Sequence, residues 1–343
     1  MTAEPLTQLP TSRVPDPADA PPLRWGILST GGIAGAMADA LAAHTRQQVV
    51  AVGSRTEESA RTFADRFGID RAHGSMEALL ADDEVDVVYV ASPHSEHHRQ
   101  ALAAIAAGKN VLVEKAFTQN AEEAQQVVDA ARDAGVAAVE AMWTRFLPQT
   151  DVLRQLLADD CLGDVVTVIA DHGQYFDSDP NHRLFAPDLA GGALLDLGVY
   201  PVSFASMVLG GPLRVTARGE KAFTGVDGRV SMLLETGRPG AHAVVDTTLF
   251  AATPTTATVS GTVARVEISG PFYAPGTLTY VHRKGSRLTF DGGEIRDHRG
   301  LAYEAAHLAQ LIADGLTESP LMPLDETVQI ITVLDDALRQ LRD

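Results

Sequence analysis

The alternation of apolar, strand-like segments with helical segments between residues 23 and 140 is the feature that most constrains the fold. Strands are predicted at residues 24–29, 49–54, 85–91, 111–113 and 136–140, and helices at 33–44, 57–67, 95–107 and 120–134. Segments that alternate at this spacing form right-handed βαβ units around a parallel sheet. Ser95 is expected to cap its helix, and Asn120 with Glu123 is expected to form a capping box.

The rhythm changes after Ala141, where short strands separated by turn residues dominate. They are predicted at residues 165–171, 213–218, 229–235, 241–250, 256–260, 264–269, 277–283 and 287–290, with helices at 149–157, 199–209, 303–315 and 325–341. This pattern indicates an α+β domain built on a large, open and mainly antiparallel sheet. The predicted fold class is α/β, with a Pro-rich arm at 1–22, a parallel-sheet domain at 23–140 and a C-terminal domain at 141–343.

Length and composition exclude several classes of protein. A chain of 343 residues favours two domains, and the net charge of −18 disfavours nucleic acid and anionic membranes as partners. No apolar run approaches the roughly 20 residues that cross a bilayer, and no signal peptide is recognised. Cys161 is the only cysteine, which excludes an intrachain disulfide and a zinc cluster and favours the cytoplasm. The arm at 1–22 is expected to be extended and mobile.

A glycine turn after the first strand is the candidate nucleotide site. It comprises Ser29, Thr30, Gly31, Gly32 and Ile33. A dinucleotide site needs a backbone that approaches the pyrophosphate closely and a helix N-terminus directed at it. Gly31 supplies the close approach, although Ser29 stands where the GxGxxG pattern has its first glycine. The alternative is a βα turn that binds no ligand.

The ends of the following strands carry further candidate cofactor contacts. The second strand ends in Ser54 and Arg55, where an NAD site usually has an acidic residue that binds the ribose. A guanidinium pairs with a 2′-phosphate, so NADP is favoured, with NAD use remaining possible if Arg55 only stacks on the adenine.

Two more strand ends are expected beside the nicotinamide. Ser92 and Pro93 shape the loop after the third strand, and His94 and His97 are expected close to the cofactor. Glu114 and Lys115 end the strand after that, where ligands bind in open α/β sheets. No partner at a known spacing completes a metal site around the histidines, so no metal is predicted.

Four motifs give the chain a resemblance to a known family. They are residues 24–29 (RWGILS), 114–115 (EK), 140–146 (EAMWTRF) and 191–200 (GGALLDLGVY). The chain resembles the Gfo/Idh/MocA oxidoreductases over nearly its whole length after the arm, and looks most like the branch of dimeric dihydrodiol dehydrogenases and NADP-dependent D-xylose dehydrogenases. A serine at the position of Ser29 is usual in that branch.

The resemblance implies an N-terminal Rossmann domain and a C-terminal domain whose open sheet often forms a dimer. A homodimer or a dimer of dimers is therefore expected. It also implies that Lys115 and Tyr200 are the catalytic pair. The family has a proline after the lysine, often in a cis bond that shapes the loop, and this chain has Ala116 instead.

Hydride removal from an alcohol also requires a base that takes the hydroxyl proton. Tyr200 is the candidate, since a neighbouring ammonium from Lys115 would favour its phenolate. Asp196 either orients a substrate hydroxyl or Lys115, or caps the following helix.

Four further residues are candidate substrate contacts. Trp143 and Phe146 form either an apolar wall for a ring-shaped substrate or packing between domains. Arg145 and Arg183 either contact substrate hydroxyls or form salt bridges.

The sequence therefore predicts an NADP-dependent oxidoreductase that acts on a small polyol or sugar, at C1 of an aldose or on a cyclic trans-diol. One alternative is a reductase of an imine, an enone or another oxidised ring on the same fold. The other is a cofactor-binding sensor without turnover, which the presence of Lys115 and Tyr200 disfavours.

Overall fold

The computed structural model describes residues 4–236 and 240–341. The chain forms two compact units, each assembled from segments that are distant in sequence. The parallel-sheet unit comprises Pro15–Trp143 and Asp297–Val328, and the mixed-sheet unit comprises Met1–Val14, Thr144–Arg296 and Gln329–Asp343. Residues 297–328 were predicted to belong to the C-terminal domain. They belong to the parallel-sheet unit instead.

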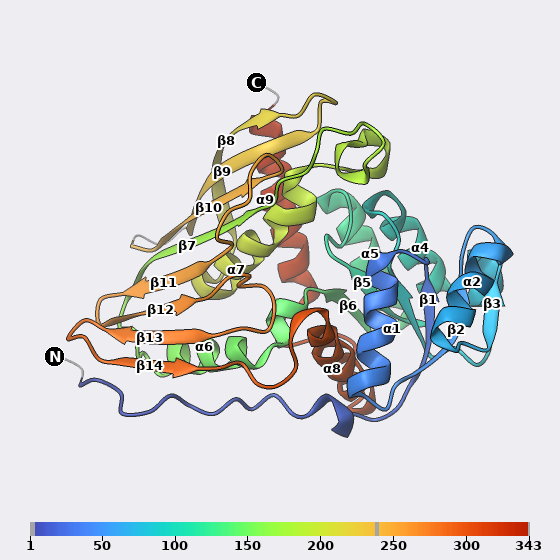
Figure 1. The fold of residues 1–343 in the computed structure, drawn as a ribbon, viewed down its shortest axis with the longest axis horizontal. Coiled ribbons are helices and arrows are strands. Elements are labelled where there is room, and N and C mark those ends of the chain that lie inside the picture. Colours follow the sequence, from blue (N-terminus) through green and yellow to red (C-terminus); the bar gives the residue numbers. More distant parts are fainter. Residues whose placement is uncertain (1–3, 237–239, 342–343) are drawn as a thin grey trace. The chain divides into compact units, whose positions relative to one another are not determined.

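The parallel-sheet unit is built on six strands in the order β3-β2-β1-β4-β5-β6, all parallel to their neighbours (Figure 1). They are β1 (Arg24–Leu28), β2 (Gln48–Gly53), β3 (Arg71–His73), β4 (Val87–Val90), β5 (Asn110–Glu114) and β6 (Ala138–Ala141). Every residue of β4 is buried, as expected for a strand covered on both faces. The strand order reverses between β1 and β4, where nucleotides bind in doubly wound folds.

Helices α1 (Gly32–His44), α2 (Glu57–Phe67), α4 (His94–Ala106) and α5 (Ala121–Ala134) connect these strands as predicted. Asn120 caps α5 by accepting a hydrogen bond from the N–H of Glu123 at 2.9 Å. The predicted cap at Ser95 is wrong, because α4 begins at His94 and follows Pro93. Strand β3 and helix α3 (Met76–Leu80) were not predicted, since both are too short for a periodic pattern.

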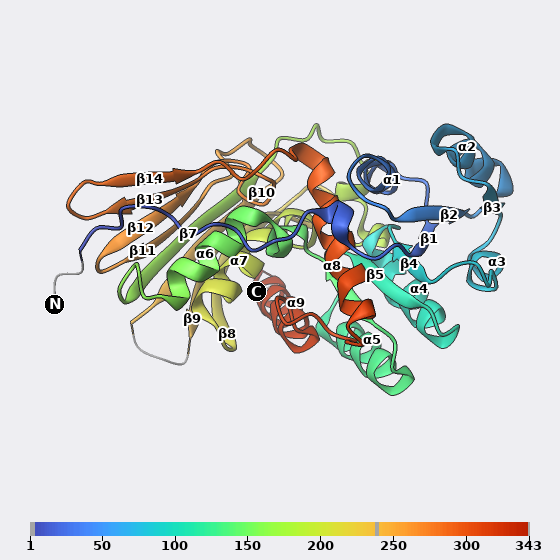
Figure 2. The same ribbon diagram turned by 90° about the horizontal axis from the view of Figure 1, so that it is seen from below.

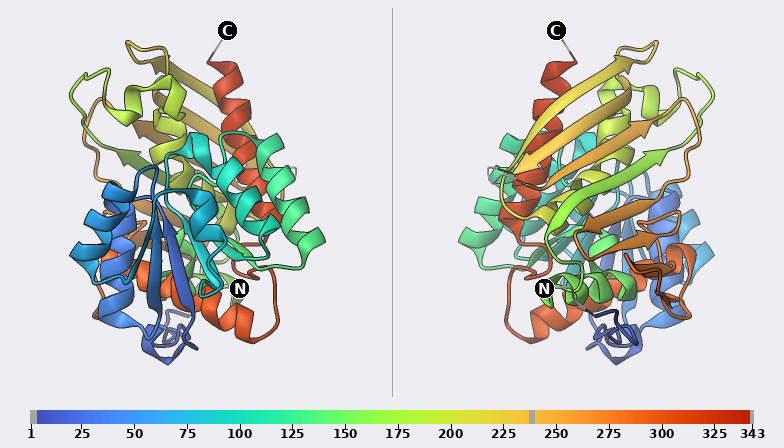
Figure 3. Two further views of the ribbon diagram at one scale, coloured as in Figure 1. Left: turned by 90° about the vertical axis from the view of Figure 1, so that its right-hand side faces the viewer. Right: turned by 90° about the vertical axis from the view of Figure 1, so that its left-hand side faces the viewer.

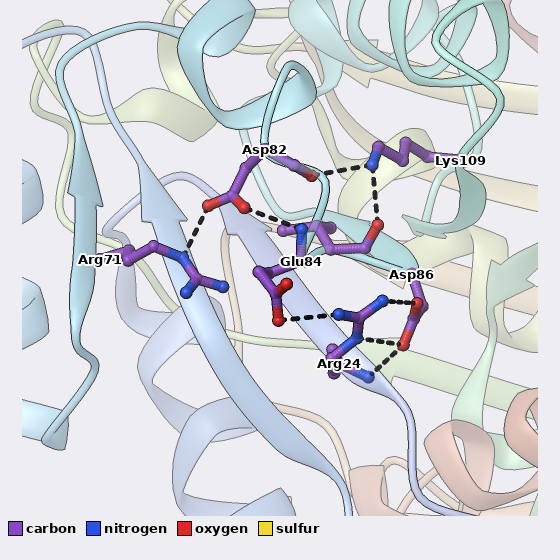
Figure 4. A network of polar contacts seen from close by, with 7 residues as sticks. Arg24, Arg71, Asp82, Glu84, Asp86 and Lys109 are labelled. Carbon is purple, nitrogen blue, oxygen red and sulfur yellow. Dashed lines mark hydrogen bonds and ion pairs between the residues drawn. The ribbon is translucent and has the colours of Figure 1, made fainter.

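A network of charged side chains fastens the loop between α3 and β4 to neighbouring strands (Figure 4). Arg24, at the start of β1, contacts Glu84 and Asp86 at 2.8 and 2.6 Å. Its guanidinium holds the pKa of the Asp86 carboxyl below the usual range. Lys109, just before β5, donates to the carbonyls of Asp82 and Val85 at 2.9 and 2.8 Å. The network lies where β1, β4 and β5 begin, and so at the sheet edge opposite the predicted nucleotide site.

The mixed-sheet unit contains an eight-stranded sheet in the order β14-β13-β12-β11-β7-β10-β9-β8. Its strands are β7 (Val165–Gly173), β8 (Leu213–Lys221), β9 (Asp227–Thr236), β10 (His242–Thr248), β11 (Ala257–Gly261), β12 (Ala264–Ile268), β13 (Leu278–His282) and β14 (Arg287–Phe290). All neighbouring pairs are antiparallel except β7 and β10. The predicted open sheet, mainly antiparallel, is confirmed.

One face of this sheet is covered and the other is open. Figure 2 shows α6 (Pro148–Ala158) and α7 (Val199–Leu209) along one face, and the right-hand view of Figure 3 shows the strands uncovered on the other. Burial alternates along the strands, as expected for a sheet solvated on one side. On the open face Ile169, Val244 and Leu233 lie side by side, because Val244 pairs with both of the others. These three side chains are 53%, 45% and 37% exposed.

Residues from both ends of the chain complete the parallel-sheet unit. The short helical turn η6 (Asp297–Gly300) and α8 (Leu301–Ala313) pack against α1, and η1 (Pro17–Asp19) packs against α8. Ala20 packs with Ala306 and Ala309 of α8. Helix α9 (Leu324–Gln340) ends the chain, and its Gln340 bonds to β8.

The expected mobility of the N-terminal arm is not what the described residues show. The Arg13 guanidinium pairs with the Asp151 carboxylate of α6 at 2.7 Å, and the Arg13 N–H donates to the same carboxylate. The side-chain amide of Gln155 donates to the carbonyl of Thr11 at 2.9 Å. The arm is extended as predicted, but these contacts attach it to α6.

Among the described residues, one helical stretch, Pro187–Leu209, is long and apolar enough to cross a membrane by length and composition alone, and 78% of its apolar window is buried. Core helices of soluble proteins pass the same test. The burial agrees with a core helix, which α7 is, since it packs on β7 and β10.

Candidate functional site

The turn between β1 and α1 presents an uncapped helix N-terminus. Helix α1 begins at Gly32, and Gly31 at its N-cap position offers no side-chain cap. Ser29 adopts a φ of 112°, in the region that favours glycine, and its Oγ accepts a hydrogen bond from the N–H of Gly31 at 3.2 Å. Ser29 therefore holds a backbone conformation that favours glycine, at the cost of backbone strain.

Among the described residues, nothing requires a glycine at residue 32. A Cβ added there would meet no atom within 4 Å, and its φ lies outside the left-handed range. At Gly31, which has a φ of −75°, an added Cβ would meet only the Ser29 Oγ, at 3.6 Å. The turn at Gly31 and Gly32 is therefore open enough for a ligand to approach the backbone closely.

A cavity of about 780 Å³ opens at this turn and follows the outer face of α1. Besides the turn and α1 it is lined by Phe63 and Arg66 of α2 and by Asp297, His298 and Arg299 of η6. Arg299 is exposed, and the described part of the chain offers it no ion pair. Sequence reasoning missed this residue, because nothing in the pattern indicates that a turn some 270 positions later packs beside α1.

The end of β2 carries Ser54 and Arg55 as predicted. The N–H of Ser54 is bonded to the carbonyl of His73 at 3.0 Å, which fixes the backbone there. Arg55 is exposed, and among residues 4–236 and 240–341 no hydrogen bond or ion pair engages its guanidinium. In a chain with 45 acidic and 27 basic residues, an arginine without such a partner is available to an anionic ligand.

The two predicted histidines after β4 are buried beneath the loops. Both ring nitrogens of His97 lie against backbone carbonyls, of Ala116 at 2.9 Å and of Ser92 at 2.8 Å, and its side chain is fully buried. Burial lowers the pKa of His97. His94 lies 3.2 Å from the carbonyl of Lys115. His97 therefore joins the loops after β4 and β5, with both ring nitrogens engaged by backbone carbonyls.

Lys115 follows directly on β5, at the edge where the strands end. Its N–H donates to the carboxylate of Glu114 at 3.1 Å, and the same carboxylate accepts the hydroxyl of Tyr89 from β4. The Lys115–Ala116 peptide bond is cis although the family's proline is absent. The backbone on both sides of the lysine is thus held, by Glu114 before it and by His97 after it.

Tyr200 lies in the first turn of α7 within an aromatic cluster in the mixed-sheet unit. Its ring stacks on Tyr273 with centroids 4.4 Å apart, and His172 lies 5.4 and 4.6 Å from the two rings. His172 faces the carbonyl of Leu197 through Nδ1 at 3.2 Å and the amide nitrogen of Gln174 through Nε2 at 3.0 Å. Both ring nitrogens of His172 are thus engaged, which fixes the ring against the two tyrosines.

Tyr273, the other phenol of the stacked pair, is half-buried. Burial raises its pKa, a hydrogen bond with Gln174 lowers it, and the charge of Asp196 raises it again, with a net increase. Sequence reasoning missed His172, Gln174 and Tyr273. A signal existed for the first two, since His172 lies at the end of β7 and Gln174 directly follows that strand.

Asp196 and Arg183 form a two-pronged ion pair with N–O distances of 3.0 and 3.2 Å. Asp196 lies in a π-helical turn, Leu194–Gly198, and does not cap α7, whose first turn has no side-chain cap. Of the two alternatives for Arg183, the structure shows the salt bridge. The Arg183 side chain is 54% exposed.

The three aromatic and cationic residues of the 143–146 turn are buried. Arg145 is 2% exposed and donates to the hydroxyl and carbonyl oxygens of Ser203 at 3.0 and 2.8 Å. Trp143 stacks on His298 with centroids 5.9 Å apart, and Phe146 is 2% exposed. Trp143 thus packs within the parallel-sheet unit, Phe146 is buried, and Arg145 makes a structural bond to α7.

The glycines of the 191–200 motif have a structural cause. Gly192 has a φ of 130°, and a Cβ there would lie 2.2 Å from the Asp227 carboxylate. Asp227 accepts the N–H of Leu194 at 2.6 Å, and burial raises the pKa of its carboxyl to about 7. The carboxyl of Asp227 thus supports the turn that leads into Asp196 and Tyr200.

The doubly wound sheet, the open glycine turn and the lysine at its edge define a dinucleotide-dependent oxidoreductase. The NAD-binding Rossmann model of the Gfo/Idh/MocA oxidoreductase family matches residues 23–141, and the C-terminal domain model of that family matches residues 150–267. A trans-1,2-dihydrobenzene-1,2-diol dehydrogenase from Xenopus laevis is 37% identical over 327 residues, which cover 93% of this chain and 98% of the relative.

Solved structures agree. A 3-ketoreductase from Actinomadura kijaniata in complex with NADP and TDP-benzene is 27% identical, with a TM-score of 0.81 over 93% of this chain and 97% of the other. An NAD-binding oxidoreductase from Klebsiella pneumoniae is 26% identical, with a TM-score of 0.83 over 94% and 97%. This chain belongs to the Gfo/Idh/MocA oxidoreductase family, and it is an NAD(P)-dependent dehydrogenase acting on CH–OH groups.

Proposed function

We propose that the protein is an NADP-dependent dehydrogenase whose substrate is an aldose oxidised at C1 or a cyclic trans-diol. The observation that carries this proposal is the 37% identity to a trans-diol dehydrogenase over nearly the whole chain. The similarity to a 3-ketoreductase favours a second candidate, reduction of a ring ketone by the same chemistry in reverse.

The residues that would hold the dinucleotide fit that group. The open turn of Thr30, Gly31 and Gly32 leads into the N-terminus of α1, which stabilises a pyrophosphate. Arg299 lines the same cavity and adds a positive charge. Arg55 supports NADP over NAD, because its guanidinium would pair with the 2′-phosphate. When bound, the nicotinamide supplies or accepts the hydride.

In the proposed reaction, side chains of the protein transfer the proton of the substrate hydroxyl. We propose that Tyr200 takes the hydroxyl proton during oxidation and returns it during reduction, with Lys115 supplying the positive charge that favours the phenolate. Asp196, held by Arg183, would orient a substrate hydroxyl.

The open face of the mixed sheet supports a homodimer. Ile169, Val244 and Leu233 form an apolar row across three neighbouring strands, and such a patch on an uncovered sheet marks an interaction surface. A dimer of dimers stays an alternative assembly. For localisation we propose the cytoplasm, where the single half-buried Cys161 stays reduced.

The experiment is a panel of aldoses and cyclic trans-diols with NADP and NAD, followed by the absorbance of the reduced cofactor. Replacing Tyr200 with Phe should lower kcat by about 10²- to 10⁴-fold while NADP binding persists. Tyr273→Phe is the matched control, since it removes the other stacked phenol and keeps the ring, and kcat should fall much less. Equal losses in the two variants would refute Tyr200 as the base.

A further inference from the structure

The helical stretch that carries Asp196 and Tyr200 begins without a cap of its own. It starts with the π-helical turn Leu194–Gly198 and continues as α7, and the residue at its N-cap position, Ala193, makes no side-chain cap. The two residues before Ala193 are glycines, so none of the three has a side-chain oxygen. The first N–H groups of a helix have no partner within the helix, and when they are buried they need an acceptor from elsewhere.

Asp227 supplies that acceptor from a strand 33 positions later in the chain. It is the first residue of β9, and its carboxylate accepts the N–H of Leu194 at 2.6 Å. Both partners are buried, with Asp227 6% and Leu194 2% exposed. Burial raises the pKa of this carboxyl, and the backbone N–H groups of Leu194, Asp227 and Ala193 act in the opposite direction. Asp227 therefore has the role of an N-cap that reaches the helix from another element.

The glycine at residue 192 leaves the space for this contact. A Cβ at Gly192 would lie 2.2 Å from the Oδ1 atom of Asp227, so any other residue there would displace the carboxylate from the N–H of Leu194. Gly192 and Asp227 are therefore two parts of one capping arrangement. Two residues beyond Leu194, the Asp196 side chain is held by its ion pair with Arg183. The turn is thus fixed at its first backbone N–H and again at the carboxylate of Asp196.

We propose that Asp227 is a positioning residue for Asp196 and Tyr200, because its carboxyl fixes the first turn of the helical stretch on which both side chains lie. Leu194, the residue that it holds, precedes Asp196 and Tyr200 by two and six positions. A displacement of about 1 Å in a catalytic group can cost about 100-fold in rate. The kinetic consequence rests on the roles proposed for Asp196 and Tyr200, whereas the capping contact does not, so the two can fail separately.

Capping is tested by amide hydrogen exchange in the full chain, without any turnover. Asp227→Asn keeps an oxygen that accepts the N–H of Leu194, whereas Asp227→Leu has a similar volume and no acceptor. Exchange at Leu194 should stay within about threefold of the wild type in the Asn variant. In the Leu variant it should become about 5- to 30-fold faster, the effect of losing a cap on local opening. Asp227→Ala takes the place of the Leu variant if that variant does not fold. Unchanged exchange in the variant without an acceptor would overturn the inference.

The positioning role is tested by kinetics, with the substrate that the panel of aldoses and cyclic trans-diols identifies. Asp227→Asn should keep kcat within about threefold of the wild type, because it keeps the acceptor. Asp227→Leu should lower kcat at least about tenfold. The dissociation constant of NADP should change less than about twofold in both, since the glycine turn belongs to the parallel-sheet unit and Asp227 to the other. Equal kcat values for the two variants would refute the positioning role and leave the capping result standing.

Asp82→Ala is the matched control for a loss of stability alone. The Asp82 carboxylate also accepts a backbone N–H, from Glu84 at 2.9 Å, and it pairs with Arg71 at 2.8 Å (Figure 4). Its side chain is 9% exposed and lies at the sheet edge opposite the predicted nucleotide site. The variant should therefore lose stability and keep kcat within about twofold. A kcat loss as large as that of Asp227→Leu would show that kcat follows stability alone, and the positioning role would be wrong.

The proposed function fails on a different result. Full turnover in Tyr200→Phe would remove the proposed base, while the exchange rate at Leu194 would still decide whether Asp227 is the cap.

Discussion

Replacing Gly32 with Ala tests whether the glycine serves the stability of the protein or the binding of its ligand. The added Cβ would meet no protein atom within 4 Å, and the residue is the first of α1. Alanine is a better helix former than glycine by up to about 1 kcal/mol. The free energy of unfolding without ligand should therefore be unchanged or rise by up to about 1 kcal/mol.

Cofactor affinity should change in the opposite direction. A backbone N–H that binds a phosphate oxygen brings the two atoms to about 2.9 Å, which leaves too little room for a methyl group on the same residue. Loss of one charge-assisted hydrogen bond costs roughly 1.5–3 kcal/mol, equivalent to a dissociation constant about 10- to 150-fold higher.

The assay pairs urea unfolding of the free protein with a titration of NADP and NAD followed by fluorescence. Both nucleotides should lose affinity by the same factor, since both carry the pyrophosphate. An unchanged dissociation constant in a variant of normal stability would refute the reasoning. The added methyl group would then not interfere with the nucleotide, and ligand binding would not explain the glycine.

Three other changes test separate parts of the molecule. Arg55→Ala should weaken NADP by at least about tenfold and NAD by far less, as one charge-assisted contact is lost; equal loss in a binding titration would remove the phosphate assignment. Asp227→Asn should abolish a stability contribution that is present below about pH 4 and lost as pH rises through about 7, a span of roughly 4 kcal/mol in the difference between the two unfolding curves; curves that stay parallel from pH 4 to 8 would contradict the buried proton. Ile169→Asp should convert a dimer to a monomer in light scattering, since it puts a charge into the apolar row; an unchanged mass would show that this face is not the interface.

Local patterns were sufficient for the main architecture. The alternation before residue 141 predicted the parallel sheet and its four long helices, because apolar strands buried on both faces leave a clear signal. The short elements β3 and α3 were missed, since three and five residues carry no readable period.

Long-range placement explains the remaining differences. Nothing in the spacing of residues 297–313 indicates that η6 and α8 pack beside α1, so Arg299 was not a candidate. The pairing of Arg183 with Asp196 and the burial of His97 likewise depend on contacts that a linear pattern does not contain.

In the candidate site, too, local sequence predicted some features and long-range contacts determined the others. The open turn at Gly31 and Gly32 follows from local sequence, because a glycine that serves a ligand is readable from its motif. The stacking of Tyr273 on Tyr200 joins residues 73 positions apart, and no motif links them. Ser29 adopts a φ of 112° in this chain. A serine at this position is usual in the branch that the chain resembles.

The docking of η6 and α8 on α1 affects any attempt to divide this polypeptide. A fragment that stops at Ala141 would contain all six parallel strands, yet it would expose the flank of α1 and lack Arg299. Exchanging nucleotide-binding halves between relatives therefore requires residues 297–328 to be exchanged together with residues 15–143, as two separate segments.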